Sequence, residues 1–92
     1  MDLNLQVSYR RAFYVRRRRL KNRIYLIHLA RLIEIDELSS YVWLLCDGSR
    51  NPLQVAKLVA SKFQEIDAGQ AGALALYNIS FFSERRLVLP ES

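Results

Sequence analysis

Several residue types that often carry chemistry are scarce in this chain of 92 residues. It has one cysteine and one histidine, which excludes an intramolecular disulfide and leaves too few ligands for an ordinary zinc site. It has three glycines and no glycine-rich phosphate loop. No stretch of the sequence approaches the roughly 20 apolar residues needed to span a membrane. These absences argue against a metalloenzyme, a nucleotide-binding enzyme and a membrane protein, and we expect no cofactor.

The remaining candidates for catalysis stand alone. His28 lies in a β-prone apolar run without a second histidine, and Cys46 falls in an apolar helical turn, where free cysteine behaves as a small hydrophobe. Asp36, Glu37 and Asp47 flank a predicted helix as caps and solvated ends, and no serine has a base at a recognisable spacing. We therefore expect a binding module rather than an enzyme. The amino-terminal residues lack the order of a secretory signal, so the expected location is the cytoplasm.

Positive charge is concentrated in the first third of the sequence. The net charge is +5, yet residues 1–31 contain Asp2 as their only acidic residue and include four consecutive arginines, Arg16 to Arg19. This asymmetry indicates an anionic partner, either nucleic acid or an acidic peptide or protein. The alternative is a solvated strand edge, on which basic side chains discourage aggregation between sheets.

The hydrophobic pattern predicts one α+β domain over residues 1–92, with the order of a winged helix-turn-helix whose wing comes first: a three-stranded antiparallel sheet followed by three helices. Strands are expected at residues 12–18, 23–29 and 31–35. The link at Leu29–Ala30 is too short for a helix, so the last two strands should form an antiparallel hairpin. Residues 87–89 are expected as a short terminal strand or extended tail. Residues 1–9 show no period and are expected to be flexible.

Three helices follow the strands. Asp36 can cap a helix over residues 37–46 that turns Leu38, Val42 and Leu45 toward the core and ends at Asp47-Gly48. The run Asn51-Pro52-Leu53-Gln54 combines a capping box with proline at the first helical position. Asp67, with Gln70 three residues later, starts a third helix that should extend over residues 68–85.

Two of these elements offer surfaces suited to binding. In the strand over residues 31–35, Ile33 and Ile35 should face one side and Leu32 and Glu34 the other. If this strand lies at the sheet edge, its unpaired backbone groups can accept an added strand.

The second surface is the third helix, which is apolar nearly all round. One stripe suits the core and consists of Ala75, Ile79 and Phe82. The second stripe consists of Leu74, Tyr77, Asn78 and Phe81. Either the helix is central and both stripes are enclosed, or the second stripe lines a groove for a partner.

The segment from Ile35 to Ala56 resembles the PqqD family, the pyrroloquinoline quinone biosynthesis protein D group. The most telling part is the run Trp43-Leu44-Leu45-Cys46-Asp47-Gly48, which is followed by the capped helix with Val55-Ala56. The layout of the second half is similar too, because apolar residues of the family's second and third helices are matched by Phe63, Ile79, Phe82 and Leu87. The resemblance covers residues 12–89.

The resemblance implies a recognition element for ribosomally synthesized and post-translationally modified peptides (RiPPs). Such proteins are small, non-enzymatic chaperones that bind the leader segment of a precursor peptide. They present it to a modifying enzyme, often a radical SAM protein, or to a leader peptidase. The leader pairs as an added strand on the third strand and lies against the third helix. The expected binding residues are Arg31, Leu32, Ile33, Glu34, Ile35, Leu74, Tyr77, Asn78, Phe81 and Arg85.

Two other hypotheses remain. A winged-helix DNA-binding protein would contact phosphates with its basic first third and place a later helix in the major groove. However, the second helix carries only Lys57 and Lys62, and the third has no polar, basic face, so nucleic acid is not the expected partner. A structural subunit that stabilises an enzyme through an exposed apolar stripe is the other hypothesis.

Overall fold

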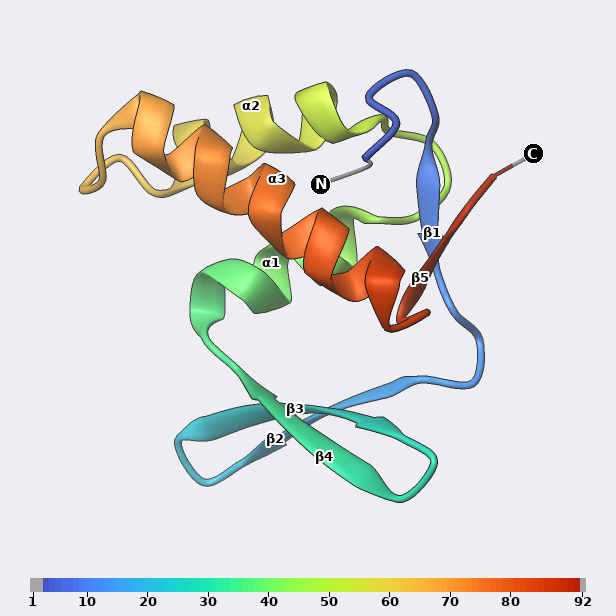
Figure 1. The fold of residues 1–92 in the computed structure, drawn as a ribbon. Helices are drawn as coiled ribbons and strands as arrows, with labels where there is room; N and C mark the ends of the chain where they lie inside the picture. Colours follow the sequence, from blue (N-terminus) through green and yellow to red (C-terminus); the bar gives the residue numbers. More distant parts are fainter. Residues whose placement is uncertain (1–2, 92) are drawn as a thin grey trace.

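The structure is a computed structural model that describes residues 3–91. Three helices form one layer, a three-stranded sheet forms the second, and a two-stranded ribbon lies beside them (Figure 1). The helices are α1 (Glu37–Leu45), α2 (Pro52–Lys62) and α3 (Ala68–Glu84). The strands are β1 (Tyr9–Arg11), β2 (Arg16–Leu20), β3 (Arg23–His28), β4 (Arg31–Ile35) and β5 (Val88–Pro90). The predicted class, a three-stranded antiparallel sheet followed by three helices, is confirmed.

The three-stranded sheet has the order β2-β3-β4, with both neighbouring pairs antiparallel. Leu26 of β3 is fully buried, and its partners are Arg17 on β2 and Ile33 on β4. The β3–β4 hairpin turns at Leu29–Ala30 as predicted, and β4 has the predicted bounds. Ile33 packs against the core while Leu32 is exposed, which confirms the predicted alternation along β4.

The first strand of this sheet lies further along the chain than residues 12–18. The amide of Ala12 donates to the carbonyl of Leu87. The amide of Val15 donates to the carbonyl of Ala12, so the chain turns here. Both side chains are buried in the core. The segment therefore crosses from β1 to the sheet as an anchored loop, and β2 begins only at Arg16.

The ribbon joins the two ends of the chain, and its first strand was not predicted. Tyr9 in β1 pairs with Pro90 in β5, and the amide of Gly48 donates to the carbonyl of Tyr9 from the other side. Leu3 and Val7 pack against the core. The predicted flexibility of residues 1–9 stays a prediction, and residues 1–2 of that range lie outside the described residues. Tyr9 itself is buried.

All three helix starts match the predicted capping residues. The Asp36 carboxylate accepts from the Ser39 amide at 2.8 Å, and the Asp67 carboxylate accepts from the Gln70 amide at 3.2 Å. At α2, the Asn51 and Gln54 side chains complete the capping box. Local side-chain to backbone bonds thus set the helix boundaries, because first-turn amides have no partner within the helix.

The core lies between the helices and the inner face of the sheet. The predicted stripe of α3 is buried, and Phe82 is its largest side chain. On α1, Leu38 and Val42 are buried as predicted, but Leu45 is only half-buried. The helix ends at Leu45, and the next residue, Cys46, turns inward instead. The chain then runs beside β1, which leaves Leu45 at the margin of the core.

The turn between β3 and β4 generates the first testable prediction. Leu29 and Ala30 have φ of 50° and 62°, a left-handed conformation that costs a residue with a Cβ roughly 1–2 kcal/mol. Glycine removes this cost but has more freedom in the unfolded chain. We expect Ala30→Gly to raise the free energy of unfolding by about 0.5–1 kcal/mol, measured by urea denaturation with Trp43 fluorescence.

The matched control for this turn variant is Ala73→Gly, at an exposed position inside α3. It should lower the free energy of unfolding by about 1 kcal/mol, because glycine is the poorer helix former. Equal losses in both variants would show that the left-handed turn is not present in solution.

Candidate functional site

β4 forms one edge of the sheet. It pairs with β3 on one side, and no strand among residues 3–91 pairs with it on the other. His28 and Arg31 flank a two-residue turn, so their backbone groups hydrogen-bond to each other. Along an antiparallel ladder, such hydrogen-bonded pairs alternate with pairs that are not hydrogen-bonded. It follows that Leu32 and Glu34 direct their backbone N–H and C=O groups away from β3. These are the groups that an added strand would meet.

A groove of about 800 Å³ separates this edge from the end of α3. It is lined by His28, Leu29, Arg31, Leu32, Ile33, Arg85 and Leu87. The lining combines apolar side chains with two guanidinium groups. An extended peptide on β4 would therefore lie beside both apolar surface and positive charge.

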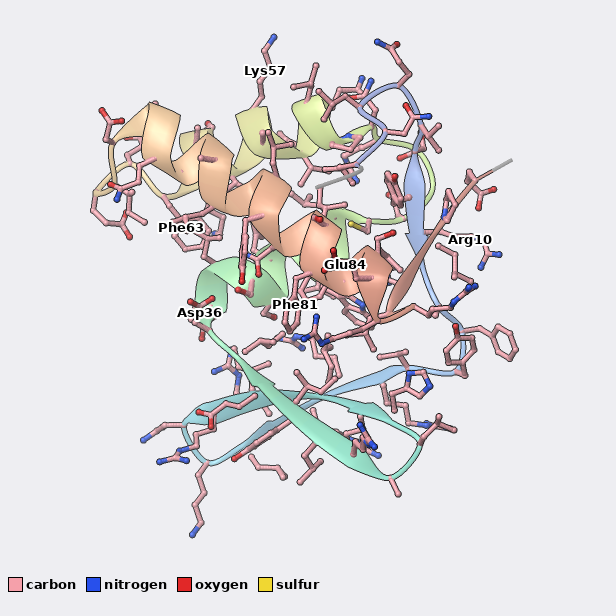
Figure 2. All side chains as sticks on the ribbon, viewed as in Figure 1. Arg10, Asp36, Lys57, Phe63, Phe81 and Glu84 are labelled. Atoms are coloured by element: carbon pink, nitrogen blue, oxygen red, sulfur yellow. The ribbon has the colours of Figure 1, made fainter. Side chains whose placement is uncertain are left out.

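A second hollow of about 350 Å³ lies along α3 itself. Its lining consists of Tyr77, Ser80, Phe81, Glu84 and Arg85. Arg85 lines both hollows, so the two adjoin. The Arg85 guanidinium carbon lies 3.8 Å from the centre of the Phe81 ring, which is cation–π geometry. Phe81 lies on the side of α3 that faces the sheet (Figure 2).

Six of the ten expected binding residues meet in these two hollows. They are Arg31, Leu32, Ile33, Tyr77, Phe81 and Arg85. Tyr77 is 58% exposed, so its ring is available to a ligand. Phe81 is half-buried and packs against Phe82 with the ring centres 5.9 Å apart. This places Phe81 at the boundary between core and groove.

The other four expected residues line neither hollow. Glu34 forms an ion pair with Arg23 of β3, with 3.6 Å between nitrogen and oxygen, and Ile35 packs against the core. Leu74 is exposed one turn before Asn78. The Asn78 side-chain amide donates to the Leu74 carbonyl at 2.9 Å and so bonds to its own helix.

Three residues that line the groove were not among the expected binding residues. His28 and Leu29 belong to the predicted hairpin, and the fold brings them into one lining with Leu87, which follows α3. The ring of Tyr14 packs against His28 with centres 5.0 Å apart, and its hydroxyl donates to the Arg86 carbonyl at 2.9 Å. Tyr14 thus ties the hairpin to the end of α3. The aromatic pair Phe13-Tyr14 was the available signal, although it was assigned to a strand.

Of the candidates for catalysis, His28 lines the groove, whereas Cys46 and Asp47 line neither hollow. Burial raises the pKa of the Cys46 thiol to about 12, so it stays protonated at neutral pH. Hydrogen bonds from the Ser49 hydroxyl and amide lower the pKa of the exposed Asp47 carboxyl. Across residues 3–91, no cluster of His, Cys, Asp and Glu side chains is placed to hold a metal ion. No helix in that range has the length and apolarity to cross a membrane.

Cys46 gives a second testable prediction. A buried, protonated thiol is a poor nucleophile, so iodoacetamide at pH 8 should leave the native protein unmodified for hours, as followed by mass spectrometry. In urea the pKa returns to its ordinary value and alkylation should be complete within minutes. Rapid labelling of the native protein would contradict the burial of this thiol.

Two solved structures are similar to this chain. One is the PqqD truncation of Methylobacterium extorquens PqqCD, described as a functional, stand-alone RiPP recognition element. It has 21% identity and a TM-score of 0.73, and the alignment covers 95% of this chain and 94% of that one. The other is TbiB1 in complex with the TbiA(beta) leader peptide, at 13% identity and a TM-score of 0.68, with 90% of this chain and 98% of that one covered.

No family model matches the sequence, and no curated protein matches it either. The chain has the fold of a RiPP recognition element, which confirms the predicted PqqD-like fold. More particularly, the similarity to the PqqD truncation extends over 95% of this chain and the similarity to TbiB1 over 90%.

Proposed function

We propose that this protein is a non-enzymatic peptide chaperone that binds the leader segment of a ribosomally made precursor peptide. The leader adds to β4 as a further antiparallel or parallel strand and lies against α3. The protein then presents the peptide to a modifying enzyme, such as a radical SAM protein, or to a leader peptidase. The observation that carries the proposal is a β4 edge that no strand among residues 3–91 pairs with, beside a groove that adjoins a hollow lined by Phe81 and Tyr77.

The two parts of this site have different tasks. The backbone groups of Leu32 and Glu34 supply hydrogen bonds at a fixed repeat, which gives affinity for extended peptides of many sequences. Selectivity comes from the groove, where Phe81 and Tyr77 can receive apolar side chains. Arg31 and Arg85 favour acidic side chains in the leader, because opposite charges attract across a partly desolvated surface.

The similar structures support this proposal through their fold. TbiB1 is a protein solved with a leader peptide, and the PqqD truncation is a recognition element. Of the ten residues in the first hypothesis from the sequence, peptide binding at residues 31–35 and along the third helix, six line two adjoining hollows. The alternative of a DNA-reading helix is less favoured, since one of the two lysines of α2, Lys62, lies over the Tyr41 ring with its Nζ 5.3 Å from the ring centre.

Strand addition can be tested by amide hydrogen exchange in the protein with and without peptide. Candidate precursor peptides are taken from short reading frames beside this chain's gene, and the peptide that binds in calorimetry is the probe. Without it, the amides of Leu32 and Glu34 should exchange fast while that of Ile33 is protected. With it, Leu32 and Glu34 should slow at least tenfold. Binding without new protection at these two amides would exclude strand addition.

The groove can be tested by calorimetry with the same peptide. If Phe81 is a buried anchor for the leader, Phe81→Ala should weaken binding by about 2 kcal/mol, roughly 30-fold. Because Phe81 also contacts Phe82, the exposed Tyr77→Ser serves as a second variant and should weaken binding several-fold with the fold intact. The control is Leu53→Ser, because Leu53 lies on α2 and is 49% exposed. This variant should bind the peptide as the parent does. Unchanged affinity in Phe81→Ala and Tyr77→Ser would remove α3 from the site.

A further inference from the structure

The face of the sheet that points away from the helices has no covering element among residues 3–91. All three helices lie on the opposite side of β2, β3 and β4 (Figure 1). Strand alternation and the pairing register assign eight side chains to this surface, the outer face. They are Arg16, Arg18, Leu20, Arg23, Tyr25, Ile27, Leu32 and Glu34.

The outer face has an apolar centre that is open to solvent. Tyr25 and Ile27 on β3 are half-buried, flanked by Leu20 at 52% exposure and Leu32 at 60%. A monomeric domain gains nothing in stability from leaving such side chains together at the surface. Contiguous apolar surface with a polar rim is typical of a protein contact.

The arginine run divides between the two faces of the sheet. Arg17 points inward and donates to the Ser40 hydroxyl at 2.7 Å, and Arg19 pairs with Glu37 at 2.8 Å. Arg16 and Arg18 point outward, and no carboxylate of the described residues lies within ion-pair distance of either. Two uncompensated guanidinium groups therefore border the apolar centre.

We propose that the outer face docks a protein whose contact surface is an apolar patch bordered by carboxylates, and that this protein is the enzyme that processes the bound peptide. The inference rests on the proposed function for the identity of the partner. Arg16 and Arg18 would pair with its carboxylates, and Tyr25, Ile27 and Leu20 would pack against its apolar patch. Arginine and tyrosine are among the residues enriched at the energetic centres of such contacts.

A polyanion fits the outer face less well than a protein does. Phosphate groups gain nothing from contact with the apolar side chains of Leu20, Ile27 and Leu32. Glu34 is already balanced by Arg23 at 3.6 Å, which suits a partner of mixed polarity. Duplex DNA and anionic membranes are therefore the competing partners in the test.

The bound peptide would itself extend the outer face. A strand added to β4 places alternate side chains on each side of the sheet. Those opposite Ile33 turn toward α3, and those opposite Leu32 and Glu34 turn outward. The enzyme would then contact β2, β3 and the outward half of the peptide together. Peptide and enzyme would each raise the affinity for the other, because binding free energies are linked reciprocally.

The test uses the full chain, the precursor peptide that it binds, and any modifying enzyme or leader peptidase whose gene adjoins that of this chain. Enzyme affinity is measured by biolayer interferometry with and without peptide, and peptide affinity by calorimetry. Arg18→Glu and Leu20→Ser lie on β2, at the sheet edge remote from β4. Each should weaken enzyme binding at least tenfold and change peptide affinity less than twofold. Saturating peptide should tighten enzyme binding at least threefold for the parent protein.

The matched controls are Lys57→Glu, with the same change of charge on α2, and Leu53→Ser, with the same loss of an exposed leucine. Both should bind the enzyme as the parent does. Equal enzyme affinity in Arg18→Glu and the parent overturns the inference. Albumin serves as the non-specific control, and the inference is also overturned if the parent protein binds the enzyme no faster or tighter than it binds albumin. A parent protein that binds the enzyme but not the peptide overturns the proposed function and leaves the outer face as a docking surface.

Two further probes distinguish the chemistry of the partner. A 20-base-pair duplex and vesicles of phosphatidylglycerol should both bind weakly at 150 mM salt, where phosphate attraction is screened. Tight binding of either probe that Arg18→Glu abolishes, with enzyme binding unaffected, assigns the outer face to a polyanion and overturns the inference.

Discussion

The two-residue turn at Leu29 and Ala30 is the constraint on which the candidate site depends. It fixes the pairing of β3 with β4, and that register decides which backbone groups of β4 are free. Asp36 follows β4 at once and caps α1, so the chain leaves the sheet before another strand can cover the edge. The exposed edge is therefore a direct result of two adjacent local features. Moving the pairing by one residue would bury Leu32 and expose Ile33.

The helix side of the groove is held with similar firmness. The Trp43 indole donates to the Leu87 carbonyl at 3.2 Å, and the Leu87 amide donates to the Phe82 carbonyl at 2.8 Å. Tyr14 binds the neighbouring Arg86 carbonyl. The segment that presents Arg85 is thus fixed by core contacts on one side and by the hairpin on the other. A groove fixed before binding loses less conformational entropy when a peptide enters it.

The sequence was sufficient to predict the features that depend on local interactions. The caps at Asp36, Asn51 and Asp67 and the β3–β4 hairpin each depend on a few consecutive residues, and all were predicted. β1 was not, because its strand partner is at the other end of the chain and it has no pattern of its own. Residues 12–15 have β propensity, but hydrogen bonding to Leu87 keeps them out of the sheet. Long-range partners override propensity in both cases.

The candidate site shows the same division. The edge strand and the apolar character of α3 could be read from the sequence, but helix periodicity alone could not tell which turn of α3 faces the groove. Leu74 and Phe81 belong to one predicted stripe, yet Phe81 lines the hollow that adjoins the β4 groove and Leu74 does not. The carboxyl-terminal half of α3 lies nearer to the sheet than its amino-terminal half does (Figure 1). This orientation of α3 is set by its packing against α1 and α2.

The arginine run illustrates how one local rule can separate two roles. Successive residues of a strand point to opposite faces, so four consecutive arginines on β2 cannot act as a single charged patch. Arg17 and Arg19 join β2 to α1 through Ser40 and Glu37, and their reversal would disturb this contact as well as any partner. Arg16 and Arg18 are the pair whose charge is directed to solvent. The sequence showed an excess of positive charge, whereas the alternation of side chains along β2 shows which half of that charge is available for recognition.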